Sequence, residues 1–288
     1  MLKGLITALV TPFHQNMIDY DSLAKLVQFQ LDNGVFALVV LGSTGEANSL
    51  TIVEKVALVE FVISKVASRA KIIVGVPNNN YKDTENFIDN FNGIPGIDYF
   101  MLATPSYIKP TQVGLYQYFS CLATLSKLPV ILYNVPGRTC CDLLDDTVIS
   151  LANDYEKIVG LKDATGNLAR LCYLNKHRPR NFSLLSGDDE TSMAFVLSGG
   201  DGVISVTSNI VPLAMTNMIN AALNFEKEKA ISINNELIDI YKAMFVESNP
   251  IPVKWALAYK DIIETSELRF PLTNLSDVYH NQFKLLLK

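Results

Sequence analysis

Eight short apolar segments, most of them rich in β-branched residues, recur along this chain. They span residues 4–10, 37–41, 71–76, 99–103, 129–133, 158–161, 182–185 and 202–206. Between them lie segments with an apolar residue every three or four positions, such as the run from Leu23 to Leu31 before Gly34. The pattern predicts strands that alternate with helices over most of the chain.

Polar residues mark the starts of several predicted helices. Thr51 and Glu54 have the spacing of a capping box. Thr84, Thr111 and Asn167 stand where N-cap residues are expected. These signals establish the order in which strands and helices follow one another.

That order restricts the fold to two choices. Near-continuous apolar strands separated by helices indicate a parallel sheet that is covered on its outer face. Eight such units suffice to close a barrel, so the sequence predicts an α/β protein with the (β/α)8 TIM barrel fold. A doubly wound open sheet is the alternative, which we disfavour because no Gly-x-Gly-x-x-Gly turn follows the first predicted strand.

The last part of the chain is helical in pattern. Breaks occur near Pro212, Glu226, residues 249–252 and Pro271. We interpret residues 1–211 as the barrel and residues 212–288 as a C-terminal helical extension. Because no Gly/Ser-rich linker separates the two, we expect the extension to pack on the barrel as one structural unit.

Charge and cysteine content restrict the partners and the compartment. The chain of 288 residues has a formal net charge of −5 without blocks of like charge, so we expect small-molecule partners and no nucleic acid or membrane. Its four cysteines are too sparse for a disulfide framework, which favours a reduced protein in the cytoplasm. The apolar run at residues 5–10 is too short for a signal sequence or a membrane span.

The sequence offers no complete set of metal ligands. His14, His177 and His280 are widely spaced, and they do not complete a site with the acidic triplet at residues 188–190. We therefore expect no metal ion. We interpret the triplet as the N-terminal end of a helix, where acidic charge is favourable.

Polar and glycine-rich stretches cluster directly after the predicted strands. They are residues 42–46, 104–107, 133–139, 162–166 and 187–190. TIM-barrel enzymes place their active sites at this end of the strands. The sequence therefore predicts an active site at the carboxyl end of the barrel.

Lys162 is the sharpest of these signals. Strand alternation puts it on the same side as Ile158 and Gly160, which should be the barrel interior. A lysine there must either pair with an anion or lose its proton, because burying a bare ammonium is costly. A neutral amine attacks carbonyl groups, so Lys162 is a candidate for Schiff-base formation. A lysine that reaches solvent or pairs with Asp163 is the alternative.

Three further signals lie near that lysine. Tyr133 ends the neighbouring strand, so its phenol is a candidate proton shuttle, with core packing as the alternative. Arg138 follows in a Pro-Gly loop and is a candidate carboxylate clamp, with a surface ion pair as the alternative. The loop at residues 42–46 offers backbone N–H groups and the Ser43 and Thr44 hydroxyls as a carboxylate cradle, and it lacks the P-loop pattern.

Together these stretches resemble the dihydrodipicolinate synthase and N-acetylneuraminate lyase superfamily of Schiff-base aldolases, from Gly4 to about Arg269. The match is best to the synthase branch, and it is carried by residues 133–139, 162–167, 185–189, 202–207 and 249–255. The resemblance implies condensation of pyruvate with L-aspartate-4-semialdehyde, the first committed step toward diaminopimelate and lysine. It implies no organic cofactor.

The resemblance also implies roles for individual residues. Lys162 would bind pyruvate as an imine, and Tyr133 would be the general acid/base. Ser43 and Tyr107 would join Tyr133 in a proton relay, with Tyr107 reaching into the site of a neighbouring subunit. Family members are commonly tetramers built as dimers of dimers, so a homotetramer is expected.

The remaining implied roles concern substrate binding. Thr44 and the backbone at Ile204 would hold the pyruvyl group, and Gly187 would line the pocket. Arg138 would bind the carboxylate of the semialdehyde.

Two other functions stay open. The synthase branch usually has threonine where this chain has Ser43, and the lyase branch often has serine. A pyruvate-dependent lyase acting on a sugar keto acid is therefore one alternative, although Arg138 matches the synthase clamp. A non-catalytic barrel that only binds a keto acid is the other, and a binder has no need of an imine-forming amine with an acid/base partner.

A last departure concerns feedback inhibition by lysine. In sensitive family members lysine binds at the dimer interface, at positions that correspond to Ala47, Asn48, Ile52, Lys55, Asn79 and Ser106. Histidines or a tyrosine common in sensitive enzymes are replaced here by Ile52, Lys55 and Ser106. A fixed cation at Lys55 would repel the ammonium groups of lysine, so we expect weak or absent inhibition.

Overall fold

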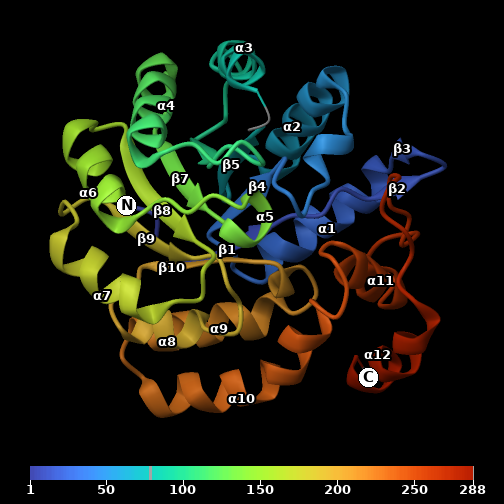
Figure 1. Ribbon diagram of the computed structural model, residues 1–288. Coiled ribbons are helices and arrows are strands. Elements are labelled where there is room, and N and C mark those ends of the chain that lie inside the picture. The colour runs from blue at the N-terminus through green and yellow to red at the C-terminus, as the bar shows by residue number, and fades with distance from the viewer. Residues whose placement is uncertain (78–79, 288) are drawn as a thin grey trace.

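The computed structural model describes residues 1–77 and 80–287, and it contains a closed barrel of eight parallel strands (Figure 1). The strands are β1 (Gly4–Ala8), β4 (Ala37–Val40), β5 (Lys71–Val76), β6 (Tyr99–Ala103), β7 (Val130–Asn134), β8 (Ile158–Asp163), β9 (Ser183–Ser186) and β10 (Gly202–Ser205). Each pairs with its neighbours in chain order, and β1 closes the ring between β10 and β4. The predicted TIM barrel is confirmed, and the open-sheet alternative is wrong.

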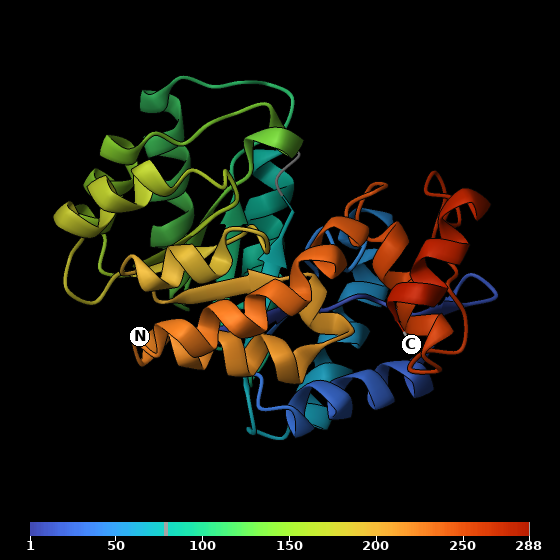
Figure 2. The same ribbon diagram turned by 90° about the horizontal axis from the view of Figure 1, so that it is seen from below.

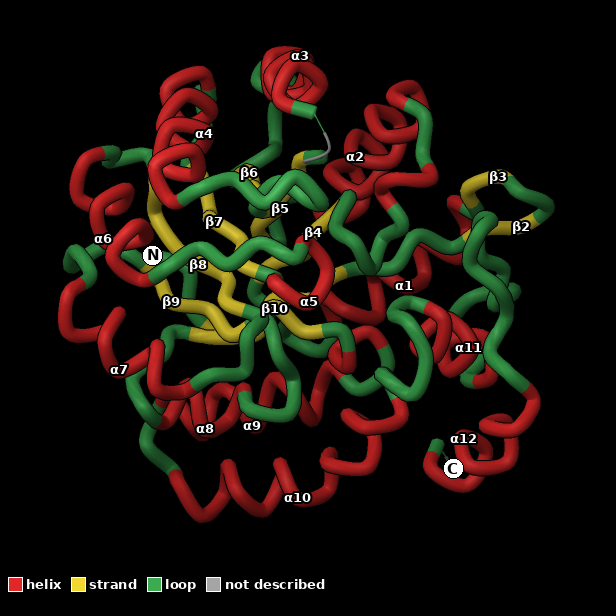
Figure 3. Tube along the Cα trace, viewed as in Figure 1, coloured by secondary structure: helices red, strands yellow, loops and turns green. Residues whose placement is uncertain are grey.

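Helices surround the strands (Figure 3). They are α1 (Tyr20–Asp32), α2 (Ile52–Val66), α3 (Tyr81–Phe91), α4 (Gln112–Leu125), α6 (Asp145–Asp154), α7 (Leu168–His177), α8 (Ser192–Leu197) and α9 (Pro212–Leu223). Short elements at the loops are the hairpin β2 (Phe13–His14) and β3 (Met17–Ile18), the turns η1 (Ala47–Ser49) and η2 (Thr207–Asn209), and α5 (Pro136–Thr139). The described ranges contain no helix with the length and apolar character that crossing a membrane requires.

Most of the predicted helix caps are present. The Thr51 hydroxyl accepts from the backbone of Glu54 and the Glu54 carboxylate accepts from the Thr51 N–H at 2.8 Å, which completes the capping box of α2. Thr111 caps α4 and Asn167 caps α7 through their side chains. Local hydrogen bonding alone specifies these starts, so they could be predicted.

The predicted cap at Thr84 is wrong. Helix α3 begins earlier, with Asn80 as the N-cap residue that accepts from the backbone of Lys82. Thr84 lies inside the helix and is buried, and its hydroxyl donates to the carbonyls of Pro77 and Asn80, each at 2.8 Å. A carbonyl one turn earlier satisfies the hydroxyl, so Thr84 fits the helix interior.

Alternation along the strands divides the core into two layers. Ile131 and Tyr133 of β7 pack inside the barrel with Ile6 and Ile204, whereas Leu132 belongs to the layer between strands and helices. Successive side chains of a strand point to opposite faces. The same rule therefore decides which residues near the end of a strand face the site.

The C-terminal part continues the helical layer. Helix α9 packs against β1, and α10 (Lys227–Ala243) packs against α9. The chain then forms α11 (Ile251–Tyr259), η3 (Asp277–Tyr279) and α12 (His280–Leu286), and α12 packs against α10. In Figure 2 this last part of the chain, in red, lies at one side of the molecule. The division at residue 211 stays a proposal.

The break expected near Pro271 is much longer than predicted and extends over residues 260–276. This stretch uses its polar groups on the barrel instead of forming a helix. The Glu264 N–H donates to the Ser22 hydroxyl at 2.9 Å, and the Thr265 hydroxyl donates to the Phe13 carbonyl at 2.8 Å. These distant partners replace the hydrogen bonds of a helix, and helical periodicity cannot reveal them.

Arg269 fastens this stretch to α2. Its guanidinium donates to the Glu54 carboxylate and, at 2.9 Å, to the Ser49 carbonyl. Hydrogen bonds from Arg269 lower the pKa of Glu54 from its usual 4.5 to about 2. The ionised carboxylate is therefore favoured in the folded protein.

We expect Glu54→Gln to lower the free energy of unfolding by about 1 kcal/mol at pH 7. Glutamine keeps the capping box but loses the charge. Because the pKa of Glu54 is lower when the protein is folded, the difference should shrink as the pH falls from about 4.5 toward 2. Urea unfolding at several pH values measures it, with Glu60→Gln, exposed on the same helix, as the control. A pH-independent difference would contradict this explanation.

Candidate active site

A cavity of about 550 Å³ opens at the carboxyl ends of the strands. Its wall includes Ser43 after β4, Tyr133 of β7 and Arg138 of α5. Residues 248–250 and 269–272 of the C-terminal extension complete the wall. The barrel mouth and the extension therefore share one concave surface at the predicted end of the strands.

Lys162 and Tyr133 meet at the base of this mouth. They are directly opposite in the register of β7 and β8, and the Lys162 Nζ lies 4.2 Å from the centre of the Tyr133 ring. Lys162 is only 6% exposed, and it is not part of the cavity wall that Tyr133 lines. The amine faces the barrel interior, so the solvent-directed alternative is wrong.

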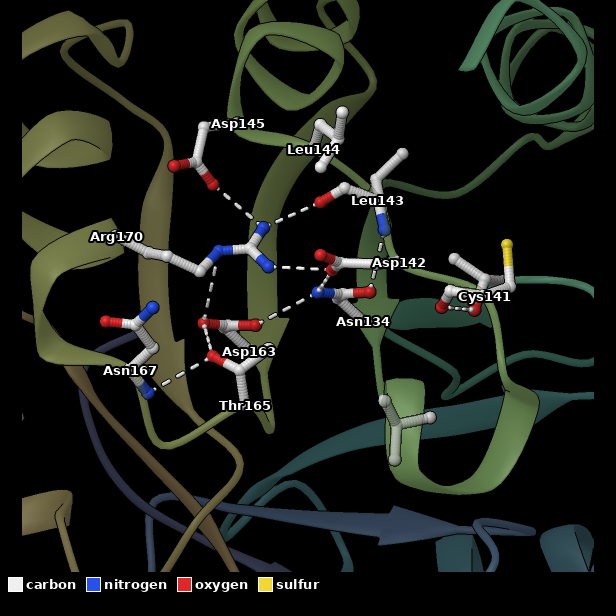
Figure 4. Close-up of polar contacts among 12 residues, drawn as sticks. Asn134, Cys141, Asp142, Leu143, Leu144, Asp145, Asp163, Thr165, Asn167 and Arg170 are labelled. Atoms are coloured by element: carbon white, nitrogen blue, oxygen red, sulfur yellow. Dashed lines mark hydrogen bonds and ion pairs between the residues drawn. The ribbon is translucent and has the colours of Figure 1, made fainter. Parts of the chain in front are cut away.

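Asp163 does not pair with Lys162, because it faces the opposite side of β8. Its carboxylate accepts from the Asn134 amide at 3.2 Å and from the Thr165 hydroxyl at 2.7 Å (Figure 4). Arg170 of α7 lies 3.9 Å from it. Burial raises the pKa of Asp163, and the charge of Arg170 opposes the rise.

The same network reaches the loop after α5. Arg170 forms ion pairs with Asp142 at 2.7 Å and with Asp145 at 2.8 Å, and Asn134 donates a hydrogen bond to Asp142 at 2.7 Å (Figure 4). Asn134 and Asp163, the residues directly after Tyr133 and Lys162, are therefore tied to each other and to a partly buried cation, Arg170. This bracing holds the two strand ends in register.

Gly187 has no side chain, and this makes room for the side chain of Lys162. A Cβ atom at residue 187 would lie 3.0 Å from the Lys162 Cε and 2.8 Å from the Ala164 Cβ. Ile204 is buried in the inner core with Tyr133. Both residues lie at the base of the barrel mouth, outside the cavity wall.

Thr44 and Arg138 are linked by a residue that sequence reasoning missed. The Thr44 hydroxyl accepts from the Asn249 side-chain amide at 2.9 Å, and Arg138 Nη2 donates to the Asn249 carbonyl at 3.2 Å. Among the described residues no carboxylate lies within ion-pair distance of Arg138, so its surface ion-pair alternative is wrong. The only feature of the sequence that pointed to Asn249 was its position in the family-like stretch 249–255.

The remaining predicted residues differ in placement. Ser43 is exposed on the cavity wall. Tyr107 is 91% exposed outside this wall, and its backbone N–H donates to the Thr139 carbonyl at 3.1 Å. One chain by itself does not bring Tyr107 to the site.

A buried ion pair between Lys254 and Glu46 lies next to the mouth, because Glu46 is also part of the cavity wall. Lys254 Nζ lies 2.7 Å from a Glu46 carboxylate oxygen, with the two side chains 0% and 2% exposed. Nζ also lies 4.2 Å from the centre of the Phe13 ring, and Glu46 accepts from the Arg269 N–H at 3.0 Å. Burial lowers the pKa of Lys254 to about 8, with Glu46 opposing. A lone charge in the apolar sequence of α11 was the available signal.

The side chains of the acidic triplet do not all act at the helix that follows it. Asp189 is buried, and its carboxylate accepts from the Val206 and Thr207 N–H groups at 3.1 and 2.8 Å, at the start of η2. The Asp188 carboxylate accepts from the Thr191 N–H at 3.0 Å, at the start of α8, whereas Asp189 bonds Ser192 there only through its main-chain carbonyl. The helix interpretation is therefore wrong for Asp189. Among the described residues no group of three or more His, Cys, Asp or Glu side chains could hold a metal ion.

Comparison with known proteins decides the family. The model of the dihydrodipicolinate synthetase family matches residues 1–288. The chain belongs to this family. It is 42% identical to a 4-hydroxy-tetrahydrodipicolinate synthase of Laribacter hongkongensis over 100% of this chain and 98% of that protein.

Solved structures agree with this assignment. A pyruvate complex of a chloride-inhibited dihydrodipicolinate synthase from Acinetobacter baumannii matches with a TM-score of 0.96 and 39% identity, over 100% of this chain and 98% of that one. A structure described as the first monomeric dihydrodipicolinate synthase variant matches with a TM-score of 0.96 and 36% identity, over 99% and 96%. The barrel and its C-terminal helices are thus features that these relatives share.

We expect Lys254→Met to lower the free energy of unfolding by about 3–5 kcal/mol, because it leaves the Glu46 carboxylate buried without its charge partner. Adding Glu46→Gln to this variant should recover part of the loss. Chemical denaturation measures both. Lys260→Met, exposed just beyond α11, is the control and should change stability by less than about 0.5 kcal/mol. Equal stability of the two lysine variants would exclude a structural role for the buried pair.

Proposed function

We propose that this protein condenses pyruvate with L-aspartate-4-semialdehyde to give 4-hydroxy-tetrahydrodipicolinate, the first committed step toward diaminopimelate and lysine. The observation that carries the proposal is the buried Lys162 amine directly opposite Tyr133 at the barrel mouth. An amine with a phenol beside it is what imine chemistry needs. The names of full-length relatives support the same reaction.

In this proposal Lys162 attacks the keto carbon of pyruvate, and water leaves from the carbinolamine. Tyr133 moves protons to and from that intermediate, joined in a relay by Ser43 and by Tyr107 of a neighbouring subunit. The imine then loses a methyl proton to become an enamine. These steps need an amine and a proton shuttle, so the proposal includes no cofactor.

Substrate binding would divide between two parts of the mouth. Thr44 and the backbone at Ile204 would hold the pyruvyl group, and Gly187 would keep the space open beside Lys162. Arg138 would bind the semialdehyde carboxylate, for which its guanidinium geometry is suited. The enamine then attacks the aldehyde carbon, which regenerates the imine to Lys162. The substrate amine attacks the imine carbon, which closes the ring and releases the Lys162 amine.

The role of Tyr107 links the reaction to assembly. Its 91% exposure in one chain suits a residue that completes a site in a second copy. We therefore propose a homotetramer built as a dimer of dimers, working in the cytoplasm. Because one similar structure is described as a monomeric variant, the oligomeric state of this protein has to be measured. Sedimentation analysis of the purified protein measures it.

The decisive experiment is mass analysis after incubation with pyruvate and borohydride, followed by peptide mapping. A parallel assay measures turnover of the semialdehyde. A reduced adduct on Lys162 together with turnover supports the proposal. An adduct without turnover would favour a lyase of the same superfamily, and no adduct would leave a binding barrel.

Two single changes separate the proposed roles. Lys162→Ala should abolish the pyruvate adduct and nearly all turnover, because the nucleophile is gone. Arg138→Ala should weaken use of the semialdehyde by about 100-fold in kcat/KM while pyruvate trapping persists, because the clamp acts on the second substrate. Adduct yield and steady-state kinetics measure the two effects. Loss of trapping in both variants would refute the clamp role.

We also expect lysine at millimolar concentration to inhibit turnover weakly or not at all. Ile52 is exposed and Lys55 is partly buried on α2, where the Lys55 ammonium would repel the ammonium groups of the inhibitor. Asn79, at one expected contact position, lies outside the described residues. Initial rates measured over a range of lysine concentrations test this, and abolished activity would overturn it.

A further inference from the structure

Asn249 lies between the two carboxylate-binding parts of the mouth. It comes from the C-terminal extension, just before α11, and the residue is on the cavity wall and 7% exposed. Its side-chain amide nitrogen donates to the Thr44 hydroxyl after β4, and its main-chain carbonyl accepts from Arg138 after β7. One residue thus contacts both groups that the proposed function assigns to substrate carboxylates.

The contact with Thr44 has a direction. Asn249 Nδ2 donates and the Thr44 oxygen accepts at 2.9 Å. A hydroxyl has one proton and two lone pairs, so this bond leaves the Thr44 proton to donate elsewhere. That proton has no acceptor among the described residues, although Thr44 is only 3% exposed. Thr44 itself is not on the cavity wall, but its chain neighbour Ser43 and its hydrogen-bond partner Asn249 are, so this proton is left for a ligand that binds at that wall.

We propose that Asn249 is a positioning residue, whose side-chain amide keeps the Thr44 hydroxyl oriented as a donor toward the carboxylate of the keto acid. This inference rests on the proposed function. The opposite arrangement, with Thr44 donating to an oxygen of residue 249, would present oxygen lone pairs to an anion. That arrangement would repel the substrate.

A second feature separates this role from simple packing. Asn249 Oδ1 is buried and has no hydrogen-bond partner among the described residues. An unpaired buried acceptor costs stability, so an amide is a poor choice for packing alone. The bond to Arg138 uses the main chain and survives any side-chain substitution at this position. The side chain should therefore affect only the pyruvate part of the site.

The test uses Asn249→Asp, which keeps the shape and replaces the donor with an acceptor. We expect its KM for pyruvate to rise about tenfold or more, because a hydrogen bond to a charged group is reversed. Asn249→Ala removes the donor without reversing it, so its KM for pyruvate should rise less, by about two- to fivefold. The KM for the semialdehyde should change by less than about threefold in both variants, because Arg138 keeps its partner.

A double-mutant cycle with Thr44→Val decides whether Asn249 acts through Thr44. In the Thr44→Val background, adding Asn249→Asp should no longer raise the KM for pyruvate, because the hydroxyl is absent. An undiminished effect would overturn the proposal, as would an equal rise in both substrate KM values. Asn249→Ala completes the test if Asn249→Asp fails to fold, and circular dichroism monitors folding.

The outcome for the inference is separable from that for the proposed function. If the unmodified protein forms no pyruvate adduct, the proposed function fails. If it forms the adduct and Asn249→Asp forms it at the same pyruvate concentrations, only the role of Asn249 fails.

Discussion

The register between β7 and β8 is the constraint on which the rest of the site depends. It sets Tyr133 opposite Lys162, and alternation then directs both side chains into the barrel. The next residues, Asn134 and Asp163, consequently face outward. The Asn134 amide donates to the Asp163 carboxylate, which also lies near the Arg170 guanidinium. A slip of one residue would exchange the two faces and place an aspartate where the amine stands. The pair of Lys162 and Tyr133 and the network around Asn134 and Asp163 thus lie on opposite faces of the same two paired strands.

The C-terminal extension completes the mouth that the barrel begins. It supplies Asn249 to the cavity wall, Lys254 to the buried pair with Glu46, and Arg269 to the ion pair with Glu54. Each of these contacts ends on the loop after β4 or on the helix that follows it. A loop of this kind is free to move by itself, and several buried polar contacts restrict it. The shape of the mouth therefore depends on the folding of the extension.

Prediction from the sequence succeeded where one segment carries its own information. The positions of the strands, although not all of their ends, follow from local periodicity. The capping box at Thr51 and the interior position of Lys162 follow from local hydrogen bonding and strand alternation. It failed at Thr84 because threonine occurs both as an N-cap residue and as a buried residue inside a helix, and the sequence does not distinguish the two. It also failed at Asp189, whose carboxylate bonds the start of η2, after the next strand, instead of α8.

The sequence by itself determined the barrel, the end of the barrel that holds the site, and the residues whose chemistry suits an imine. Those properties are periodic or local, so neighbouring residues express them. Only the tertiary structure decided that Asn249 meets Thr44 and Lys254 meets Glu46, pairs that lie 205 and 208 positions apart. Such contacts depend on how loops and helices pack at the barrel mouth, and no local pattern encodes that packing.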